Sequence, residues 1–507
     1  VTVRLVVERE REREKFQKQE YWDIIAKLQA TRDERQGENT FEAKLHKINN
    51  EVLDKFAIKN EAGAKKILDA LNGADWKVEA IEKKETKRNA YPPFTTSTLQ
   101  QSAARKLGFS AKRTMMLAQQ LYEGADIDGD RTGLITYMRT DSLNLSQDSL
   151  SAAAGFIKSN FGPDYLETKT FKTKAKGAQE AHEAVRPTDP NRTPENIAGH
   201  LDPSQLKLYR LIWQRFMASQ MTPAIFDATT VDISADNCIF RANGLIKKFD
   251  GFTKVYSLKT EETILPQLAP QEPLDLIELK PNQHFTEPPA RYSEASLVKA
   301  LEQHGIGRPS TYAPTLSTIQ DRGYIEKDES KKFKPTQMGA IVNDLLVEHF
   351  PNIVDINFTA EMEKKLDSIA EDKIEWVPVI REFYEPFEKN LKEKMEELKK
   401  SDFKKDEPTD KICPECGKPI VIKLGRFGKF YACTGFPDCK HTEKILEKID
   451  MKCPLCVEGE VIVKHTRGKK IFYGCSRYPD CKYASWVNPK LKESSGKIAE
   501  APEKTNL

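Results

Sequence analysis

The sequence predicts a multidomain α+β protein that ends in two small zinc-ribbon domains. A chain of 507 residues with 38% hydrophobic content exceeds the usual size of one hydrophobic core. Helical periodicities are mixed with β-branched, alternating runs and do not follow one repeated pattern. Eight of the nine cysteines follow residue 412 at C-x-x-C spacing, which favours metal binding over disulfides and indicates a reducing compartment. The ninth, Cys238, lies in a strand-like run and is expected to be a core thiol.

Charge and hydropathy narrow the function classes. The 80 basic and 77 acidic residues nearly balance, but residues 411–490 carry 16 Lys and Arg against 8 Asp and Glu, as a polyanion-binding surface would. No stretch approaches the roughly 20 apolar residues of a membrane span, and the chain does not start with a signal-peptide pattern. We therefore expect a soluble, cytoplasmic protein without membrane contact.

The first third of the chain predicts helices around a strand-rich segment. Residues 1–14 have an amphipathic helical pattern without a capping residue, and residues 21–94 mix alternating runs with a helix near 60–72. Pro92 and Pro93 stop a strand, and the hydroxyl residues 95–98 cap a helix that runs to Leu107. A second helix is expected over Ala111–Glu123.

Residues 133–142, Gly-Leu-Ile-Thr-Tyr-Met-Arg-Thr-Asp-Ser, contain the candidate nucleophile. Leu134–Met138 predicts a short, buried strand with Tyr137 near its end. Period-2 alternation places Arg139 on the same face, where a guanidinium could activate the phenol or neutralise a phosphate that it attacks. The alternative is that Tyr137 is a packed core ring and Arg139 a surface anchor.

This decapeptide resembles the active-site segment of type IA DNA topoisomerases, in the bacterial topoisomerase I branch. The resemblance implies that Tyr137 attacks a DNA phosphodiester to form a 5′-phosphotyrosine and that Arg139 orients and neutralises the scissile phosphate. Three further blocks match in the family's order, at residues 92–100, 179–189 and 292–325.

Two of these blocks predict DNA contacts. By resemblance, His182 contacts a DNA phosphate near the tyrosine; it is expected at the end of a helix, and a role for Arg186 stays open. In the third block, Arg308, Ser310 and Thr311 cluster at a helix that is expected to start at Pro309, and free backbone N–H groups there suit a phosphate. The alternative is an ordinary link between two helices.

Three aspartates, Asp126, Asp128 and Asp130, could suggest a magnesium pair. They lie in a glycine-containing loop between a helix and a strand, not after an apolar strand, and they lack the closing glutamate of a calcium loop. We interpret them as turn formers.

After the active-site segment we expect a helix over 142–160, a helix over 203–220, strands near 228–233 and 238–242, and mainly helices over 333–400. The resemblance arranges these parts as a type IA topoisomerase arch, or toroid. The expected divisions are: 1–33, end of an N-terminal helical domain; 34–94 and 222–279, two halves of a β-rich hinge domain; 95–221, an inserted helical domain with Tyr137; 280–400, a helical DNA-groove domain; 401–410, a linker; 411–446 and 447–490, zinc ribbons; 491–507, a disordered tail.

In the family, a helix like that of residues 1–14 follows a TOPRIM domain, whose acidic residues bind Mg²⁺. Nothing in this sequence matches that domain. We therefore expect a fragment that lacks it, and with it the Mg²⁺ site of the parent enzyme.

The C-terminal cysteines form two repeats with equivalent spacing. Four thiolates in paired C-x-x-C knuckles suit tetrahedral Zn²⁺, and units of about 30 residues do not fold without it. With four protein ligands, each site would be structural. The ligands are Cys413, Cys416, Cys433 and Cys439 in the first repeat, and Cys453, Cys456, Cys475 and Cys481 in the second.

Each repeat also interleaves aromatic and basic residues. Rings that stack on unpaired bases, with cations for the backbone, are typical of single-strand binding without base preference. The alternative is that the rings fill the small cores, and we expect some of each. The candidates for DNA contact are Arg426, Phe427, Tyr431, Arg467, Phe472 and Tyr473.

The implied function is relaxation of negatively supercoiled DNA by transient single-strand cleavage, strand passage and religation. No ATP is expected, because the phosphotyrosine preserves the bond energy and no G-x-x-x-x-G-K-[ST] loop occurs. The resemblance further implies a monomer associated with the bacterial nucleoid and an RNA polymerase contact through the ribbons. Without the TOPRIM domain, the fragment is expected not to complete this cycle. The competing hypotheses are an inert single-stranded DNA-binding remnant and a single-strand nuclease.

Overall fold

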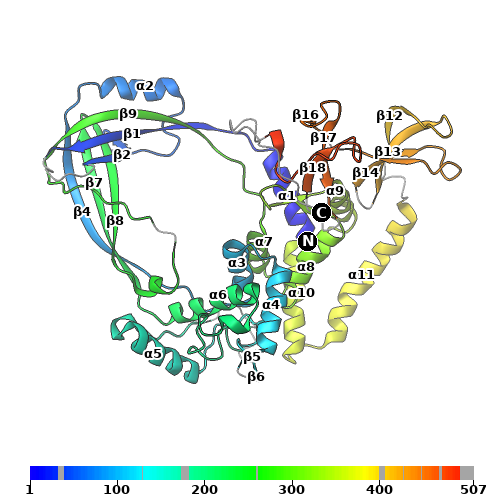
Figure 1. The fold of residues 1–507 in the computed structure, drawn as a ribbon, viewed down its shortest axis with the longest axis horizontal. Coiled ribbons are helices and arrows are strands. Elements are labelled where there is room, and N and C mark those ends of the chain that lie inside the picture. Colours follow the sequence, from blue (N-terminus) through cyan, green and yellow to red (C-terminus); the bar gives the residue numbers. More distant parts are fainter. Residues whose placement is uncertain are drawn as a thin grey trace. The chain divides into compact units, whose positions relative to one another are not determined.

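A computed structural model describes residues 1–31, 39–127, 129–172, 182–258, 261–398, 406–425, 428–446, 448–466 and 471–490. The chain forms two compact units, Val1–Leu391 and Lys392–Leu507, drawn in Figure 1. In the part of the chain that the structure describes, no helix is both long and apolar enough to cross a bilayer.

A seven-stranded antiparallel sheet, here called the hinge sheet, forms one region of the first unit. Its order is β1-β9-β4-β7-β8-β2-β3, and an additional β1–β2 pairing closes the sheet on itself. The buried side chains alternate along these strands and enclose a core that includes Cys238, as predicted. The strands are β1 (Glu20–Ala30), β2 (Thr40–Ile48), β3 (Glu51–Val52), β4 (Trp76–Arg88), β7 (Ala224–Ala235), β8 (Cys238–Phe249) and β9 (Pro273–Phe285); helix α2 (Glu61–Ala70) packs on β1 and β9.

Strand β1 corrects one predicted boundary. Residues 20–30 pair with β9 and residues 25–29 also pair with β2, so this strand belongs to the hinge sheet and not to the end of an N-terminal helical domain. Apolar residues at alternate positions, such as Ile24, Ala26 and Leu28, are fully buried in the sheet core. The strand period therefore decides the structure of this segment.

The tyrosine domain, residues 95–221, is inserted between β4 and β7. These two strands pair from Trp76↔Ala235 to Arg88↔Ala224, so the chain leaves and re-enters the sheet on neighbouring strands. The domain contains α3 (Thr96–Leu107), α4 (Ala111–Glu123), β5 (Ala125–Ile127), β6 (Asp130–Thr132), α5 (Gln147–Phe161), η1 (Pro163–Tyr165), η2 (Ala198–His200) and α6 (Pro203–Ser219). Short side chains cap the helices as predicted; Thr95 forms a capping box with Thr98, and Ser110 caps α4.

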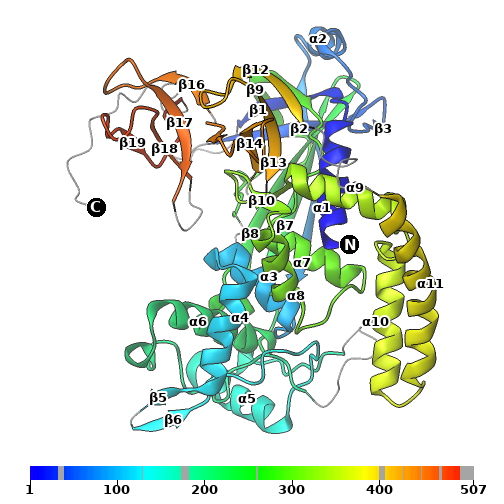
Figure 2. The ribbon, with the colours of Figure 1, turned by 90° about the vertical axis from the view of Figure 1, so that its right-hand side faces the viewer.

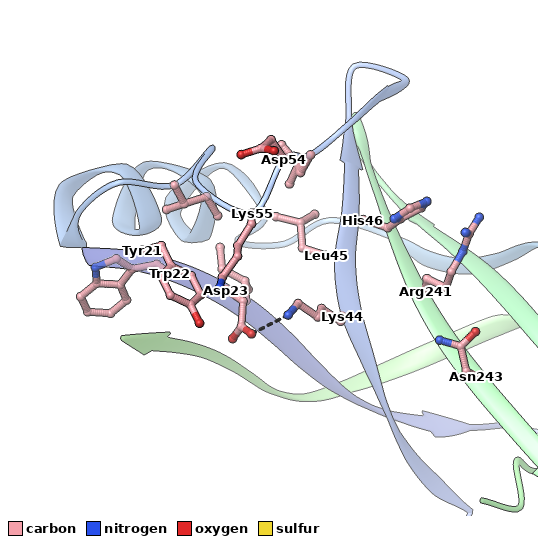
Figure 3. Close-up of a pocket in the computed structure, with 13 residues that line it drawn as sticks. Tyr21, Trp22, Asp23, Lys44, Leu45, His46, Asp54, Lys55, Arg241 and Asn243 are labelled. Carbon is pink, nitrogen blue, oxygen red and sulfur yellow. Dashed lines mark hydrogen bonds and ion pairs between the residues drawn. The ribbon is translucent and has the colours of Figure 1, made fainter. Parts of the chain in front are cut away.

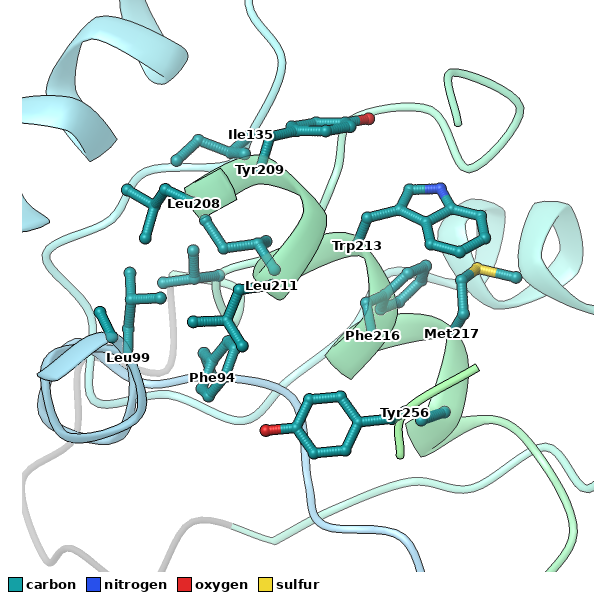
Figure 4. Close-up of a cluster of buried hydrophobic side chains, with 14 of the residues drawn as sticks. Phe94, Leu99, Ile135, Leu208, Tyr209, Leu211, Trp213, Phe216, Met217 and Tyr256 are labelled. Atoms are coloured by element: carbon teal, nitrogen blue, oxygen red, sulfur yellow. The ribbon is translucent and has the colours of Figure 1, made fainter. Parts of the chain in front are cut away.

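Helix α6 lies at the centre of the core of this domain (Figure 4). Its Tyr209 and Phe216 are fully buried against Phe94 and Leu99. Phe226, Phe252 and Tyr256, which follow the predicted end of the domain, belong to the same core. The base of the returning strands and η3 (Gly251–Lys254) is therefore packed with the tyrosine domain.

The remaining part of the first unit is mainly helical. Leu5 and Val6 of α1 are buried with Leu297, Leu301 and Leu316, so the N-terminal helix packs on this part. Figure 2 shows α10 and α11 side by side, and Phe358 and Phe383 join them at 5.9 Å between ring centroids. The elements are α1 (Thr2–Glu14), α7 (Glu294–Gln303), α8 (Tyr312–Asp321), β10 (Ile325–Lys327), β11 (Phe333–Pro335), α9 (Gln337–His349), α10 (Ile356–Ala370) and α11 (Trp376–Glu397).

The second unit contains two four-stranded antiparallel sheets of the same order. The first sheet begins at Glu407, inside the predicted linker 401–410, because Glu407 and Pro408 pair with β13. Residues 401–405 of that linker and the tail 491–507 lie outside the described residues. The strands are β12 (Glu407–Ile412), β13 (Pro419–Gly425), β14 (Gly428–Cys433) and β15 (Thr442–Lys444), then β16 (Lys448–Lys452), β17 (Glu460–His465), β18 (Ile471–Cys475) and β19 (Ala484–Ser485).

Candidate active site and metal centres

Hydrogen bonds to two neighbouring parts of the chain hold the active-site segment in place. On one side, Thr136 Oγ1 donates to the carbonyl of Ala184 at 2.6 Å, and its N–H donates to the carbonyl of Arg186 at 3.0 Å. On the other side, Thr96 Oγ1 donates to the carbonyl of Met138 at 2.7 Å. The same hydroxyl accepts from the N–H of Thr140 at 2.8 Å. These bonds fix the residues on either side of Tyr137.

The predicted strand over 134–138 is wrong. Only one isolated bridge, Ile135↔Pro187, occurs there, and a second, Phe94↔Val185, lies beside it. The segment lies between the start of α3 and residues 182–187. Its hydrogen bonds therefore go to two different neighbours, and no continuous strand pairing forms. For the same reason, the predicted helix over 142–160 starts only at Gln147, capped by Ser146.

Tyr137 is half-buried at the edge of the domain core. Its ring lies edge-on to Tyr122 at 5.4 Å and tilted against His182 at 5.5 Å between centroids. Arg139 is exposed, and no ion pair to it occurs among the described residues. The structure thus places a phenol, an imidazole and an exposed cation around one backbone segment.

His182 lies in a bend directly after residues 173–181, which are outside the described part, so the helix predicted to end at His182 falls on residues that the structure does not describe. Arg186 is turned inward and forms an ion pair with Glu183. The other oxygen of Glu183 accepts the N–H of Ser146, the cap of α5, at 2.5 Å. Arg186 therefore secures the chain beside His182 to the start of α5.

The predicted DNA groove packs against α3, the helix whose Thr96 holds the active-site segment. Glu302 of α7 accepts hydrogen bonds from Ser97 Oγ and from Gln101 Nε2, the latter at 3.2 Å. Burial raises the pKa of Tyr312, and the nearby carboxylates of Glu302 and Asp141 add to the effect.

The three predicted groove residues have different surroundings. Arg308 forms a two-point ion pair with Asp367, at 2.6 and 3.2 Å. Thr311 Oγ1 accepts the N–H of Arg308 at 2.8 Å, and Ser310 is exposed. Helix α8 starts at Tyr312 and not at Pro309. A DNA phosphate at Arg308 would compete with the Asp367 carboxylate, a contact that 59 residues of separation hid from sequence reasoning.

Sequence reasoning also missed two positioning groups. The sequence places Thr96 only in a helix cap, yet its hydroxyl holds the backbone on both sides of Arg139. Glu302 lies in the block 292–325, but no role for it is predicted from the sequence. The signal that could have found Thr96 is its place in the block 92–100, which has more hydroxyl residues than a helix cap needs.

Asp126 behaves as the predicted turn former. Its Oδ1 accepts the N–H of Gly129 at 2.9 Å in the turn between β5 and β6. Asp128 lies outside the described residues. Among the residues described, the groups of three or more side chains that could hold a metal ion are the two cysteine quartets.

The cysteines of each predicted quartet come together. Sulfurs bound at about 2.3 Å to a tetrahedral Zn²⁺ lie about 3.8 Å apart. The sulfurs of Cys413 and Cys439, and those of Cys453 and Cys481, are 3.7 Å apart, and all four of a quartet lie within 4.8 Å. The N–H of Gly459 points at the sulfur of Cys456 and lowers the pKa of this thiol to about 7, which favours the thiolate that zinc requires. Both quartets fit structural Zn²⁺.

The ribbon rings divide between core and surface. Tyr473 is only 6% exposed, so it fills the core of the second ribbon, in contrast to its prediction as a stacking ring. Tyr431 is half-buried with the Lys411 ammonium 3.8 Å from its centroid, and Phe472 packs on Trp486 at 5.7 Å. Arg426, Phe427 and Arg467 lie outside the described residues. Among the described residues of the two ribbons, the exposed rings are Phe436, Tyr478 and Trp486.

A cavity of about 380 Å³ lies in the hinge sheet beside β1 and β2 (Figure 3). Two of its lining cations are paired, Lys44 with Asp23 at 2.7 Å and Arg241 with Asp232. We do not regard it as the active site, because Tyr137, Arg139 and His182 are not among its lining residues.

The candidate site thus combines a tyrosine beside a histidine with two cysteine quartets that fit structural Zn²⁺, which is the combination expected of a type IA topoisomerase. The profile of the DNA topoisomerase family matches residues 1–381, and that of the topoisomerase DNA-binding C4 zinc finger matches residues 410–448 and 450–490. The chain therefore belongs to the DNA topoisomerase family.

A solved structure narrows the assignment within this family. The chain is similar to full-length topoisomerase I from Thermotoga maritima, with a TM-score of 0.69 and 34% sequence identity over 88% of this chain and 69% of that one. The prediction of a type IA DNA topoisomerase with C-terminal zinc ribbons, similar to bacterial topoisomerase I, is confirmed.

Proposed function

We propose that this topoisomerase relaxes negatively supercoiled DNA without ATP, by transient cleavage of one strand through Tyr137. The phenol oxygen attacks the phosphorus of a backbone diester, the bond from phosphorus to the 3′-oxygen breaks, and the 3′-oxygen leaves with a proton. The resulting 5′-phosphotyrosine keeps one phosphoester bond in place of another. After another strand passes, the 3′-hydroxyl attacks the same phosphorus and releases Tyr137.

The observation that carries this proposal is the position of Tyr137 beside His182, on a segment held from both sides, with exposed Arg139 two residues further on. A fixed backbone keeps the nucleophile in place, and proximity of this kind contributes much of the rate in phosphoryl transfer. Arg139 would stabilise charge on the phosphoryl oxygens, and His182 would hold a neighbouring phosphate.

Magnesium stays a prediction from the resemblance. The described residues of the first unit do not form an acidic cluster that fits Mg²⁺, so no step above passes through this ion. The TOPRIM domain, the impairment of the chain without it, a monomeric state, nucleoid association and an RNA polymerase contact are likewise hypotheses. The zinc ribbons are proposed to bind the single strand next to the cleavage site.

Trapping a covalent adduct tests the proposal. The zinc-loaded full chain is incubated with a single-stranded oligonucleotide labelled at its 3′ end, so that the label stays on the fragment bound through its 5′-phosphate. The reaction is stopped with denaturant, and labelled protein is measured on a gel. We expect a band that Tyr137→Phe abolishes. Tyr122→Phe is the matched control, since its ring lies 5.4 Å from that of Tyr137, and it should retain the band.

The competing hypotheses predict different results. A DNA-binding remnant gives no adduct with any variant while oligonucleotide binding persists. A single-strand nuclease gives shortened oligonucleotide without labelled protein. Either result would overturn the assignment of Tyr137.

A further inference from the structure

A buried arginine lies at the junction between the tyrosine domain and the hinge sheet. Arg215 of α6 is 8% exposed, and its Nε donates to the carbonyl of Pro92 at 2.6 Å. Its guanidinium carbon lies 4.6 Å from the ring centroid of Tyr91, 4.8 Å from that of Phe94 and 5.5 Å from that of Tyr256. The aromatic rings therefore provide most of its surroundings.

The charge of Arg215 has no acidic partner. Burying a guanidinium is costly unless a counter-charge or several hydrogen bonds accompany it. Among the residues that the structure describes, no aspartate or glutamate forms an ion pair with Arg215, and its Nη2 donates no hydrogen bond; Nη1 reaches only the Tyr256 hydroxyl, at 3.5 Å. Burial lowers the pKa of Arg215; the Tyr256 and Tyr91 hydroxyls oppose this shift, and the neighbouring Arg105 adds to it. This position is electrostatically unfavourable without an anion.

Two more cations lie beside it, at the end of α3. The Lys106 ammonium lies 3.5 Å from the ring centroid of Tyr256, the same ring that Arg215 contacts. Arg105 is exposed and donates only to a neutral amide, that of Gln101, at 3.0 Å. No ion pair of Arg105 or Lys106 occurs in the described ranges. The C-terminal end of α3 attracts cations, but it does not neutralise three of them.

We propose that Arg105, Lys106 and the Nη2 group of Arg215 bind a backbone phosphate of DNA, at a site distinct from Tyr137. A phosphodiester supplies the missing negative charge, and its oxygens suit guanidinium and ammonium donors. Tyr91 is 55% exposed at the rim of this site, so the approach to Arg215 lies on the surface.

The position of the site relates it to the proposed cleavage. Thr96, in the first turn of α3, holds the active-site segment, and Lys106 lies ten residues later, about 15 Å along the helix axis. A DNA strand bound at both ends of α3 would be held at a fixed distance from Tyr137. This inference deepens the proposed function in one respect, since it takes DNA as the substrate.

Binding of a labelled single-stranded oligonucleotide at several salt concentrations tests the proposal. All proteins carry Tyr137→Phe, so cleavage does not contribute, and the full zinc-loaded chain is used. The test variant combines Arg105→Ala with Lys106→Ala. The matched control combines Lys65→Ala with Lys66→Ala, an exposed pair on α2 that changes the net charge equally.

We expect the Kd of the test variant to rise about fivefold or more near 0.1 M salt, and the slope of log K against log salt to shrink by about 1 to 2. The control should match the parent. Arg215→Gln, with folding verified by circular dichroism, should weaken binding in the same direction. An unchanged slope in the test variant, or an equal loss in the control, would overturn the site. The experiment needs no cleavage, so its failure would leave the adduct test of Tyr137 unaffected.

Discussion

A large core cluster that includes Phe94, Phe216 and Tyr256 positions the side chains around Tyr137. Among the described residues of each zinc ribbon, the buried cluster that contains the cysteines has three members, of which at least two are cysteines. In the tyrosine domain, apolar burial and backbone hydrogen bonds determine the geometry. In the ribbons, so little apolar surface is buried that the metal must supply the stability. The two regions therefore owe their structures to different physical causes: apolar burial in the tyrosine domain and metal binding in the ribbons.

Removing a zinc ligand should have the largest effect on stability. This effect should be confined to one ribbon. Cys475→Ser takes a thiolate from a quartet whose zinc contributes roughly 10 to 16 kcal/mol to folding. We expect the protein to bind one zinc in place of two, measured by metal release, and residues 448–490 to become sensitive to protease. Cys238→Ser is the control, because this cysteine lies in the hinge-sheet core, and two zinc ions should remain. Loss of both ions in Cys475→Ser would contradict independent ribbons.

A cavity in the core of the tyrosine domain should destabilise the first unit and leave the zinc ribbons unchanged. Leu99 is fully buried beside Phe94 and Tyr209, so Leu99→Ala should cost about 2 to 5 kcal/mol. We expect a lower melting temperature for the first unit with unchanged zinc content. Val52→Ala, at a site that is 63% exposed, should have little effect. A simultaneous loss of zinc would contradict the separation of the two regions.

Removing the Thr96 hydroxyl should have a smaller effect on stability and a specific one on the site. Thr96→Val leaves a buried N–H and carbonyl near Arg139 unsatisfied, at a cost of about 1 to 3 kcal/mol. We expect slower adduct formation with unchanged binding of DNA to the ribbons. Thr96→Ser keeps the hydroxyl and should restore most of the rate. Equal rates for the valine and serine variants would argue against a positioning role.

The smallest effect should be pH-dependent and confined to the first unit. Arg291 donates two hydrogen bonds to Glu10 and holds the pKa of that carboxyl below its ordinary value of 4.5. A lowered folded-state pKa means that this stabilisation is present above the unfolded-state pKa and is lost as the pH falls through the folded one. We expect the free energy of unfolding to decrease from about pH 6 to pH 3, and to decrease less in Glu10→Gln. Identical pH profiles would rule out this contribution.

Local signals in the sequence predicted much of the secondary structure. The helices at Ala111–Glu123 and Pro203–Ser219 follow the expected bounds closely, because capping residues and glycine or proline mark their ends. The strand predicted at 134–138 failed, since its hydrogen bonds go to two segments that lie about 40 to 50 residues away in opposite directions. Local periodicity carries no information about such partners.

The sequence predicts which residue types form the site, but it does not predict which contacts these residues make. The cysteine quartets came together as expected, since their spacing encodes the geometry directly. The ion pair of Arg308 with Asp367, the pairing of Arg186 with Glu183 and the burial of Tyr473 depend on tertiary packing. The unneutralised charge of Arg215 is visible only when its aromatic neighbours, from both sides of the inserted domain, are in place.

The core that Phe226, Phe252 and Tyr256 share with α6 has a practical consequence for dissecting the molecule. An excised polypeptide spanning 90–258 would keep these three rings together with that helix. A polypeptide cut at 95 and 221 would instead leave these rings behind and expose the apolar underside of that helix to water.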